Sequence, residues 1–185
     1  MKRVFTLTPA EMLFLWRSRR LYEPLAAGGT EVSRSDSPAV EARLMSIVRS
    51  AYARAVEESE PADLPLAEIA PQLSIEVDAA GVGTARLPDG VIRVESVICD
   101  AWLAPARIAD PTDTATVARQ ANPFSRGGRA EPVAIVIPDR MLLYSFRPDE
   151  KPAVTSCMAV CMPGPDDDFI FTSSLLSKTL SYDIS

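Results

Sequence analysis

The 185-residue sequence contains no histidine. This absence excludes every site that depends on an imidazole. The Ser-His-Asp triad, the Cys-His pair and the HExxH zinc site each need a ring that exchanges a proton near neutral pH or binds a metal. Catalysis by paired carboxylates, lysine or tyrosine stays open. Because the chain also has no complete catalytic motif of another kind, we expect a protein that is not an enzyme.

Cysteine is scarce as well. Cys99, Cys157 and Cys161 form an odd count without the spacing of a disulfide framework, which favours buried thiols in a reducing compartment. Cys157 and Cys161 come nearest to a metal motif, but their neighbours favour a strand, and strand residues four apart are separated by about 13 Å. That separation is too large for one zinc ion or for a disulfide. We therefore predict core thiols, with no metal and no cofactor.

The sequence also lacks long apolar runs. None approaches the roughly 20 residues that span a bilayer, and Pro9 and Glu11 interrupt the apolar stretch after the basic N-terminus, unlike in a signal peptide. We expect no membrane partner and synthesis in the cytoplasm. The net charge of -6 argues against a chain that coats nucleic acid. We expect no sequence-specific nucleic-acid binding and no small-molecule substrate.

Two polar segments are candidates for ligand chemistry. Arg126-Gly127-Gly128-Arg129 has amides and two cations, as a phosphate-binding loop would, but the chain contains neither GxxxxGK[ST] nor GxGxxG. The pattern favours a surface loop, which in an assembly could order against a neighbour. Asp166-Asp167-Asp168 has the oxygen ligands that Ca²⁺ or Mg²⁺ prefers, although a solvated turn is favoured there. A small enzyme or ligand-binding domain that uses these carboxylates with Glu95 is the alternative interpretation.

The residue pattern predicts an α+β fold with two N-terminal helices, then a mostly antiparallel β-sheet and a short C-terminal helix. The first helix should span about residues 8–22, because Thr8 and Glu11 have the form of a capping box. The second, over about residues 37–60, has one continuous apolar face. We expect a single domain over 1–185.

The helical part of that domain should cover residues 1–60, and the β-rich part residues 61–185. In the β-rich part, the segments 132–137, 141–146 and 154–161 are predicted strands, and their short connections favour an antiparallel meander. The first and third of these strands are apolar on both faces, which indicates a sheet covered on both sides. Further predicted elements are strands at 73–77, 84–87 and 91–102 and short helices at 113–120 and 174–182.

The stretch from Leu87 to Ile137 resembles part of a known class of proteins. Its matching elements are Leu87-Pro88-Asp89, Arg93, Val97, Trp102, Pro105, Arg119-Gln120, Asn122, Arg126-Gly127 and Pro132-Val133-Ala134. In this arrangement the chain resembles small structural proteins of the head–tail connector or adaptor type, which tailed phages and prophages of gut Bacteroidetes encode. Those proteins have a helical N-terminal region before a β-rich part. The chain departs from them in its short final helix.

The resemblance implies an oligomeric virion or assembly protein with no catalytic residues to carry over. It would be located in the virion, and its partners would be further copies of itself and other virion or assembly proteins. The candidate interaction residues are Phe14, Trp16, Trp102, Arg126 and Arg129, and the segment from 105 to 130 would contact neighbouring proteins. A regulatory interaction module with an α+β fold is a third interpretation.

Overall fold

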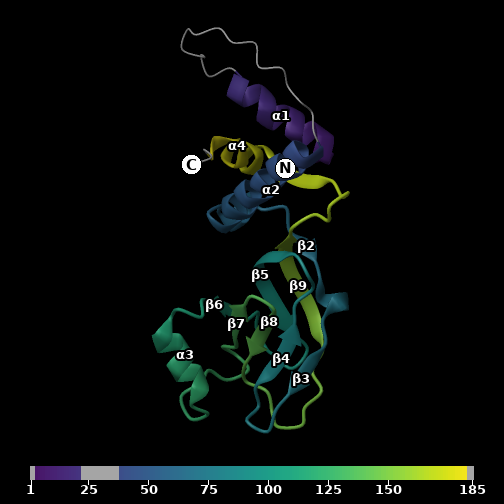
Figure 1. The fold of residues 1–185 in the computed structure, drawn as a ribbon. Coiled ribbons are helices and arrows are strands. Elements are labelled where there is room, and N and C mark those ends of the chain that lie inside the picture. Colours follow the sequence, from purple (N-terminus) through teal and green to yellow (C-terminus); the bar gives the residue numbers. More distant parts are fainter. Residues whose placement is uncertain (1–2, 22–37, 183–185) are drawn as a thin grey trace. The chain divides into compact units, whose positions relative to one another are not determined.

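The computed structural model describes residues 3–21 and 38–182, which belong to two compact units (Figure 1). The helical unit contains the described residues up to Pro65 together with those from Met162 onwards, and the sheet unit spans Leu66–Cys161. The described residues contain four α-helices and mostly antiparallel sheets, so the predicted α+β class is confirmed. Residues 162–182 pack with the N-terminal helices, whereas the sequence grouped them with the β-rich part.

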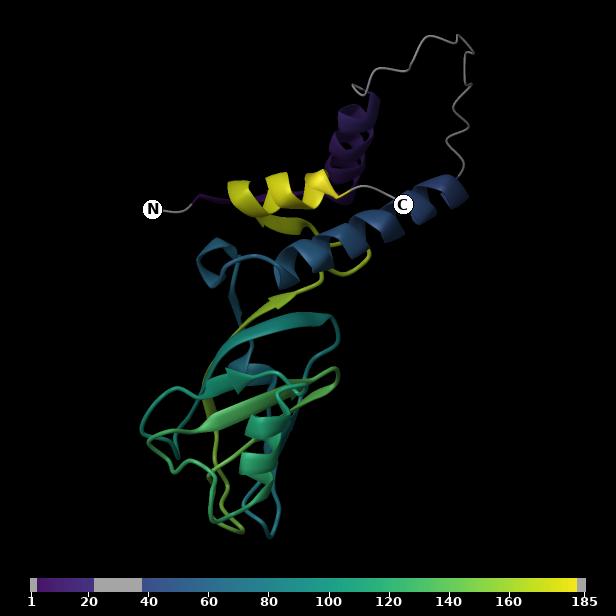
Figure 2. The same cartoon turned by 90° about the vertical axis from the view of Figure 1, so that its left-hand side faces the viewer.

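The helical unit is built around its longest helix, α2. A two-stranded antiparallel sheet, β1 with β10, and the helices α1 and α4 complete the unit, and both helices contact α2 (Figure 2). Its elements are β1 (Val4–Leu7), α1 (Pro9–Leu21), α2 (Pro38–Glu57), the 3₁₀ helix η1 (Pro61–Asp63), β10 (Phe169–Thr172) and α4 (Ser173–Ser181). The predicted end of the first helix at Tyr22 and the predicted start of the second at Ser37 lie outside the described residues.

The capping signals explain where two of these helices begin. Glu11 accepts hydrogen bonds from the backbone and the hydroxyl of Thr8, while the Thr8 hydroxyl accepts from the Glu11 N–H, which confirms the predicted capping box. The α4 helix is capped by Thr172, whose hydroxyl oxygen accepts from the Leu175 N–H at 3.2 Å. The predicted start of this helix at residue 174 is two residues after this cap.

The core of the helical unit is aromatic. Tyr52 of α2 meets Phe169 and Phe171 of β10 edge to face, with ring centroids 5.5 and 5.3 Å apart. The Tyr52 hydroxyl donates to the backbone carbonyl of Ile170 at 3.1 Å, so the one polar atom of the ring is paired. These contacts join α2 to the C-terminal segment, although more than 100 residues separate them in sequence.

The sheet unit contains two sheets. The strand order is β2-β9-β5 in one and β3-β4-β8-β7-β6 in the other, and every pairing is antiparallel except that of β6 with β7. The elements are β2 (Ala67–Glu68), the 3₁₀ helix η2 (Ala70–Gln72), β3 (Ile75–Val77), β4 (Gly83–Arg86), β5 (Val91–Cys99), β6 (Arg107–Ala109), α3 (Thr114–Ala121), β7 (Val133–Ile137), β8 (Arg140–Leu143) and β9 (Val154–Cys161).

The predicted three-strand meander is wrong in its last strand. β7 and β8 form the expected antiparallel pair, but β9 pairs with β5 and β2 in the other sheet. β8 ends at Leu143, three residues earlier than predicted, and Ser145 then has a positive φ of 77°. A residue in that conformation leaves the extended path of a strand, so the chain turns away and crosses to the second sheet.

At β7 both faces of the five-stranded sheet are covered, as predicted for that strand, whereas β9, the other strand that is apolar on both faces, belongs to the three-stranded sheet. On β7, Ala134 and Val136 belong to the core shared with the three-stranded sheet, while Val133 and Ile135 belong to a smaller cluster on the opposite face. Val117 of α3 packs against that smaller cluster. The helix α3 thus lies over one face of the sheet, and residues of α3 help to line a polar hollow beside it.

Candidate interaction surface

The helix α3 is held in place at its first turn. The Asp113 carboxylate accepts a hydrogen bond from the Thr116 N–H at 3.0 Å and caps the helix at the residue where the predicted helix 113–120 begins. Hydrogen bonds from the side chain and the backbone of Thr116 lower the pKa of Asp113. Arg107 on β6 donates to the Thr116 hydroxyl at 2.8 Å, so the parallel edge strand and the helix are joined by a polar contact.

The segment that follows α3, residues 122–131, is called the arginine loop below. Its first half is tied to the helix by reciprocal bonds: the Ser125 hydroxyl donates to the Arg119 carbonyl, and the Arg119 Nε donates to the Ser125 carbonyl, both at 2.9 Å. The Asn122 side chain accepts from the Phe124 N–H at 3.0 Å. The backbone on both sides of Phe124 is therefore fixed by hydrogen bonds.

The second half of the arginine loop is tied to the sheet unit by its two arginines. Arg126 donates to the Ala80 carbonyl at 2.8 Å, and its guanidinium carbon lies 5.6 Å from the centroid of the Tyr144 ring. Arg129 forms an ion pair with Glu150. A backbone hydrogen bond from Arg147, and then the contact with Arg129, lower the pKa of Glu150.

The arginine loop presents one large apolar side chain to solvent. Phe124 is 99% exposed, and Leu103, whose N–H donates to the Arg129 carbonyl at 2.8 Å, is 82% exposed. A scattered exposed leucine is ordinary on a protein surface. A phenyl ring exposed at almost its full area on a hydrogen-bonded loop is less common, and it gives this surface an apolar projection.

The predicted interaction residues fall into three groups. Phe14 is 69% exposed on α1 and is available to a partner. Trp16 and Trp102 are buried in the cores of their respective units. Arg126 and Arg129 are half-buried and are used within the sheet unit, where they hold the arginine loop.

Phe124 and Leu103 were not among the predicted interaction residues. Phe124 lies in a stretch without strand or helix periodicity, and Leu103 directly follows Trp102 at the end of the predicted strand 91–102. The sequence did contain a signal for an exposed Phe124. It is an isolated apolar residue directly after Pro123, within a stretch of polar residues. Nothing comparable marks Leu103, because it follows a strand and a buried tryptophan.

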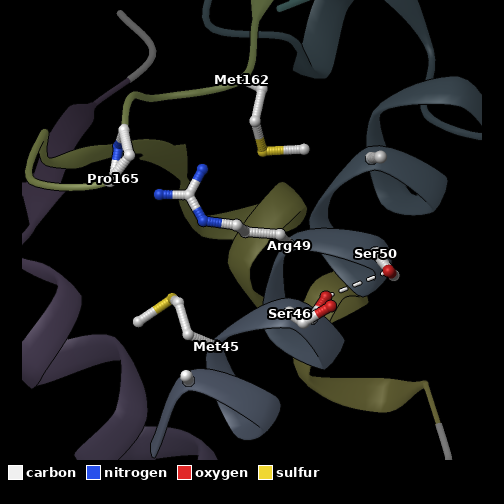
Figure 3. A pocket seen from close by; sticks show the side chains of 8 residues that line it. Met45, Ser46, Arg49, Ser50, Met162 and Pro165 are labelled. Carbon is white, nitrogen blue, oxygen red and sulfur yellow. Dashed lines mark hydrogen bonds between the residues drawn. The ribbon is translucent and has the colours of Figure 1, made fainter.

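The helical unit has a hollow of its own, an apolar groove of about 500 Å³ beside α2 (Figure 3). Arg49 crosses its floor and donates from its two terminal nitrogens to the carbonyls of Pro163 and Gly164, each at 2.6 Å. The Met45 and Met162 side chains flank the guanidinium (Figure 3). Because Arg49 is occupied by these carbonyls, the groove offers flexible apolar side chains rather than a free cation.

The candidate carboxylates belong to different units of the chain. Asp166, Asp167 and Asp168 are exposed in a turn of the helical unit, where Asp167 accepts from the Gly164 N–H at 3.0 Å. Glu95 belongs to the sheet unit and forms an ion pair with Arg93. In residues 3–21 and 38–182, no group of three or more Cys, Asp or Glu side chains could hold a metal ion.

The cysteines are free and belong to the core or its margin. Cys99 and Cys157 are buried on neighbouring strands, and Cys161 is partly buried. Burial raises the pKa of Cys99 and of Cys157 to about 12, and it also raises the pKa of Cys161. These thiols stay protonated at neutral pH. The prediction of buried core thiols is confirmed for Cys99 and Cys157, whereas Cys161 is only partly buried.

Searches against protein-family models, curated proteins and solved structures found no match to this chain. The similarity to connector-type proteins therefore depends on the residues quoted for it. None of the described helices is long and apolar enough to cross a membrane.

Proposed function

We propose that this protein is a non-catalytic assembly subunit that acts through protein–protein contacts. The sequence resemblance makes a head–tail connector-type virion subunit, working with copies of itself and with other virion proteins, the specific form of the proposal. The observation that carries it is Phe124, a fully exposed aromatic ring on a loop whose backbone is already fixed.

The rigidity of the arginine loop matters for the energetics of binding. Ordering a flexible loop on association costs free energy that reduces affinity. Here the bonds of Asn122, Ser125 and Arg126 order the loop before any partner arrives. Burial of one phenylalanine side chain is worth about 1.5–3 kcal/mol, and most of that gain is available for binding.

The surroundings of Phe124 also resemble a protein interface. Binding hot spots combine aromatic and arginine side chains within a rim of polar groups. Arg119 lies on α3 one turn before the arginine loop and is exposed, and Leu103 adds a second exposed apolar side chain on a segment bonded to that loop.

The test is sedimentation velocity of the purified full chain over a wide range of concentrations, alone and with any portal, capsid or tail proteins that the genes flanking its own encode. We expect self-association or binding to one of these proteins, and Phe124→Ser should weaken it at least about tenfold, the factor that corresponds to 1.4 kcal/mol. Phe14→Ser is the matched control, since it removes the same exposed ring from the helical unit.

Two results would contradict the proposal. One is a monomer at every concentration that binds none of the neighbouring gene products. The other is a Phe124→Ser variant that associates as strongly as the unaltered chain while Phe14→Ser does not. Association would then depend on the helical unit and not on Phe124.

A further inference from the structure

The sheet unit contains a hollow of about 540 Å³ between α3 and the chain segments that flank β6 and β7. This volume lies within the range of small-molecule sites, about 300–1,000 Å³. The residues that matter for its chemistry are Arg107, Thr116, Arg119, Gln120, Glu131 and Val133. All of them belong to the sheet unit, so the hollow is complete within one unit.

A buried amide lines this hollow. Gln120 on α3 is only 1% exposed, and its side-chain Oε1 has no hydrogen-bond partner among the described residues. A buried polar atom without a partner costs about 1–3 kcal/mol. A core position with no ligand would be filled more stably by an apolar side chain of the same shape, so the glutamine indicates a group that bonds to it from the hollow.

Charges of both signs stand around the same hollow. Arg107 and Arg119 bond only to the Thr116 hydroxyl and the Ser125 carbonyl, and in the ordered part of the chain neither has a carboxylate within ion-pair distance. The Glu131 carboxylate likewise has no cation at that distance among the residues described. All three side chains are exposed, so each keeps its charge available to a ligand.

We infer that this hollow binds a small zwitterion, a molecule that carries a carboxylate at one end and an amino or amide N–H group at the other. The carboxylate would lie between Arg107 and Arg119, because guanidinium groups pair with carboxylates in a bidentate way. The N–H end would donate to Glu131 and, once the buried Gln120 side chain turns toward the hollow, to its unpartnered oxygen. Free amino acids and short peptides share this chemistry.

The few side-chain amides of the chain make a direct test possible. The sequence has two glutamines, Gln72 and Gln120, and one asparagine, Asn122. Proton–nitrogen correlation spectra of the ¹⁵N-labelled full chain therefore contain three side-chain NH₂ pairs, and the pair that disappears in Gln120→Met is that of Gln120. Gln72, which is exposed, serves as the internal control.

The probes are the individual L-amino acids, L-alanyl-L-alanine, sodium acetate and methylammonium chloride. We expect at least one zwitterionic probe to shift the Gln120 pair in a saturable way and to leave the Gln72 pair in place. If only free amino acids bind, the ligand is an amino acid, and if only the dipeptide binds, the ligand is a short peptide. Gln120→Met and Glu131→Gln should each weaken that binding about tenfold or more, while melting temperatures show that both variants are folded.

The inference is overturned if no zwitterionic probe moves the Gln120 resonances. It is also overturned if acetate alone shifts them as strongly as the zwitterions, because an anion site would then need neither Glu131 nor the glutamine oxygen. A Gln120→Met variant that binds as tightly as the unaltered chain would likewise show that the buried amide is not part of the site.

Discussion

The indole N–H of Trp102 donates a hydrogen bond to the backbone carbonyl of Tyr144, 3.1 Å away in the core of the sheet unit. The ring of the same tryptophan stacks on Phe146, with centroids 5.3 Å apart and planes 9° from parallel. Tyr144 and Phe146 flank Ser145, the residue with positive φ where the chain leaves β8. One side chain thus stabilises the turn that sends β9 into the other sheet.

Trp102→Phe should therefore destabilise the protein by about 1–2 kcal/mol, since the smaller ring keeps part of the stacking but leaves the Tyr144 carbonyl without a partner. Denaturant unfolding monitored by circular dichroism measures the loss. Leu103→Ala is the neighbouring control, and because that side chain is exposed its effect should stay within about 0.5 kcal/mol. Equal stability of Trp102→Phe and the unaltered chain would contradict this role.

The strand β2 is fixed by one carboxylate, and this makes stability depend on pH. Glu68 accepts from the Cys157 N–H at 2.6 Å, from the Ser156 hydroxyl at 2.7 Å and from the Ala70 N–H at 3.0 Å. These bonds, that of Cys157 first, lower the pKa of Glu68 below its ordinary value of 4.5. The stabilisation is fully present above that ordinary value and is lost as the pH falls through the lower folded value.

Glu68→Gln should consequently flatten the acid limb of the stability curve. The amide keeps the shape of the side chain but cannot change charge, so the difference in melting temperature between the two proteins should shrink as the pH falls below about 4. Glu76→Gln, on the exposed face of β3 and without a resolved hydrogen bond, controls for the change in net charge. A difference that is constant from pH 7 to pH 3 would contradict the assignment.

The raised thiol pKa values predict selective labelling. At pH 8 Cys99 and Cys157 remain protonated and buried in the folded chain, because the pKa of each is about 12. Iodoacetamide should therefore modify only the partly buried Cys161 under native conditions, and slowly, while all three react after unfolding. Peptide mass spectrometry at several times distinguishes the sites. Native labelling of Cys99 or Cys157 at the rate of Cys161 would show that this core opens readily.

Local signals in the sequence were sufficient to predict where some helices begin, but they did not predict how the strands pair. The capping box of Thr8 and Glu11 and the cap at Asp113 act within one helical turn, so they predict helix starts directly. The partner of β9 depends on where the chain goes after Ser145, and no residue pattern specifies that a serine adopts positive φ. The short connections favoured β8 as the partner of β9, whereas β9 pairs with β5 and β2.

The candidate surface lies in the segment that the sequence proposed, but the residues named for it have other contacts. Arg126 and Arg129 bond to other parts of the sheet unit, and the exposed side chain of the loop is Phe124. Which side chain of a loop faces inward depends on contacts with distant segments, here Ala80 and Glu150. The unpartnered amide of Gln120 is likewise visible only once β6 and β7 lie beside α3.

The two adjacent glycines of the arginine loop offer a matched pair of substitutions. A Cβ on Gly127 would clash with the Glu131 carbonyl, and the Gly127 carbonyl accepts a hydrogen bond from the Ser145 hydroxyl. A Cβ on Gly128 meets no atom within 4 Å in the described structure. Both are glycine-to-alanine changes in one loop, so they alter the unfolded chain in the same way.

Gly127→Ala should destabilise the sheet unit by about 1–3 kcal/mol, as overpacking against backbone does, while Gly128→Ala should be neutral or slightly stabilising. If the arginine loop presents Phe124 to a partner, Gly127→Ala should also weaken association, and Gly128→Ala should not. Denaturant unfolding and sedimentation velocity on the same samples measure the two effects. Equal behaviour of the variants would mean that the close contact between Gly127 and Glu131 does not hold this loop, and the argument from a preordered Phe124 would lose its basis.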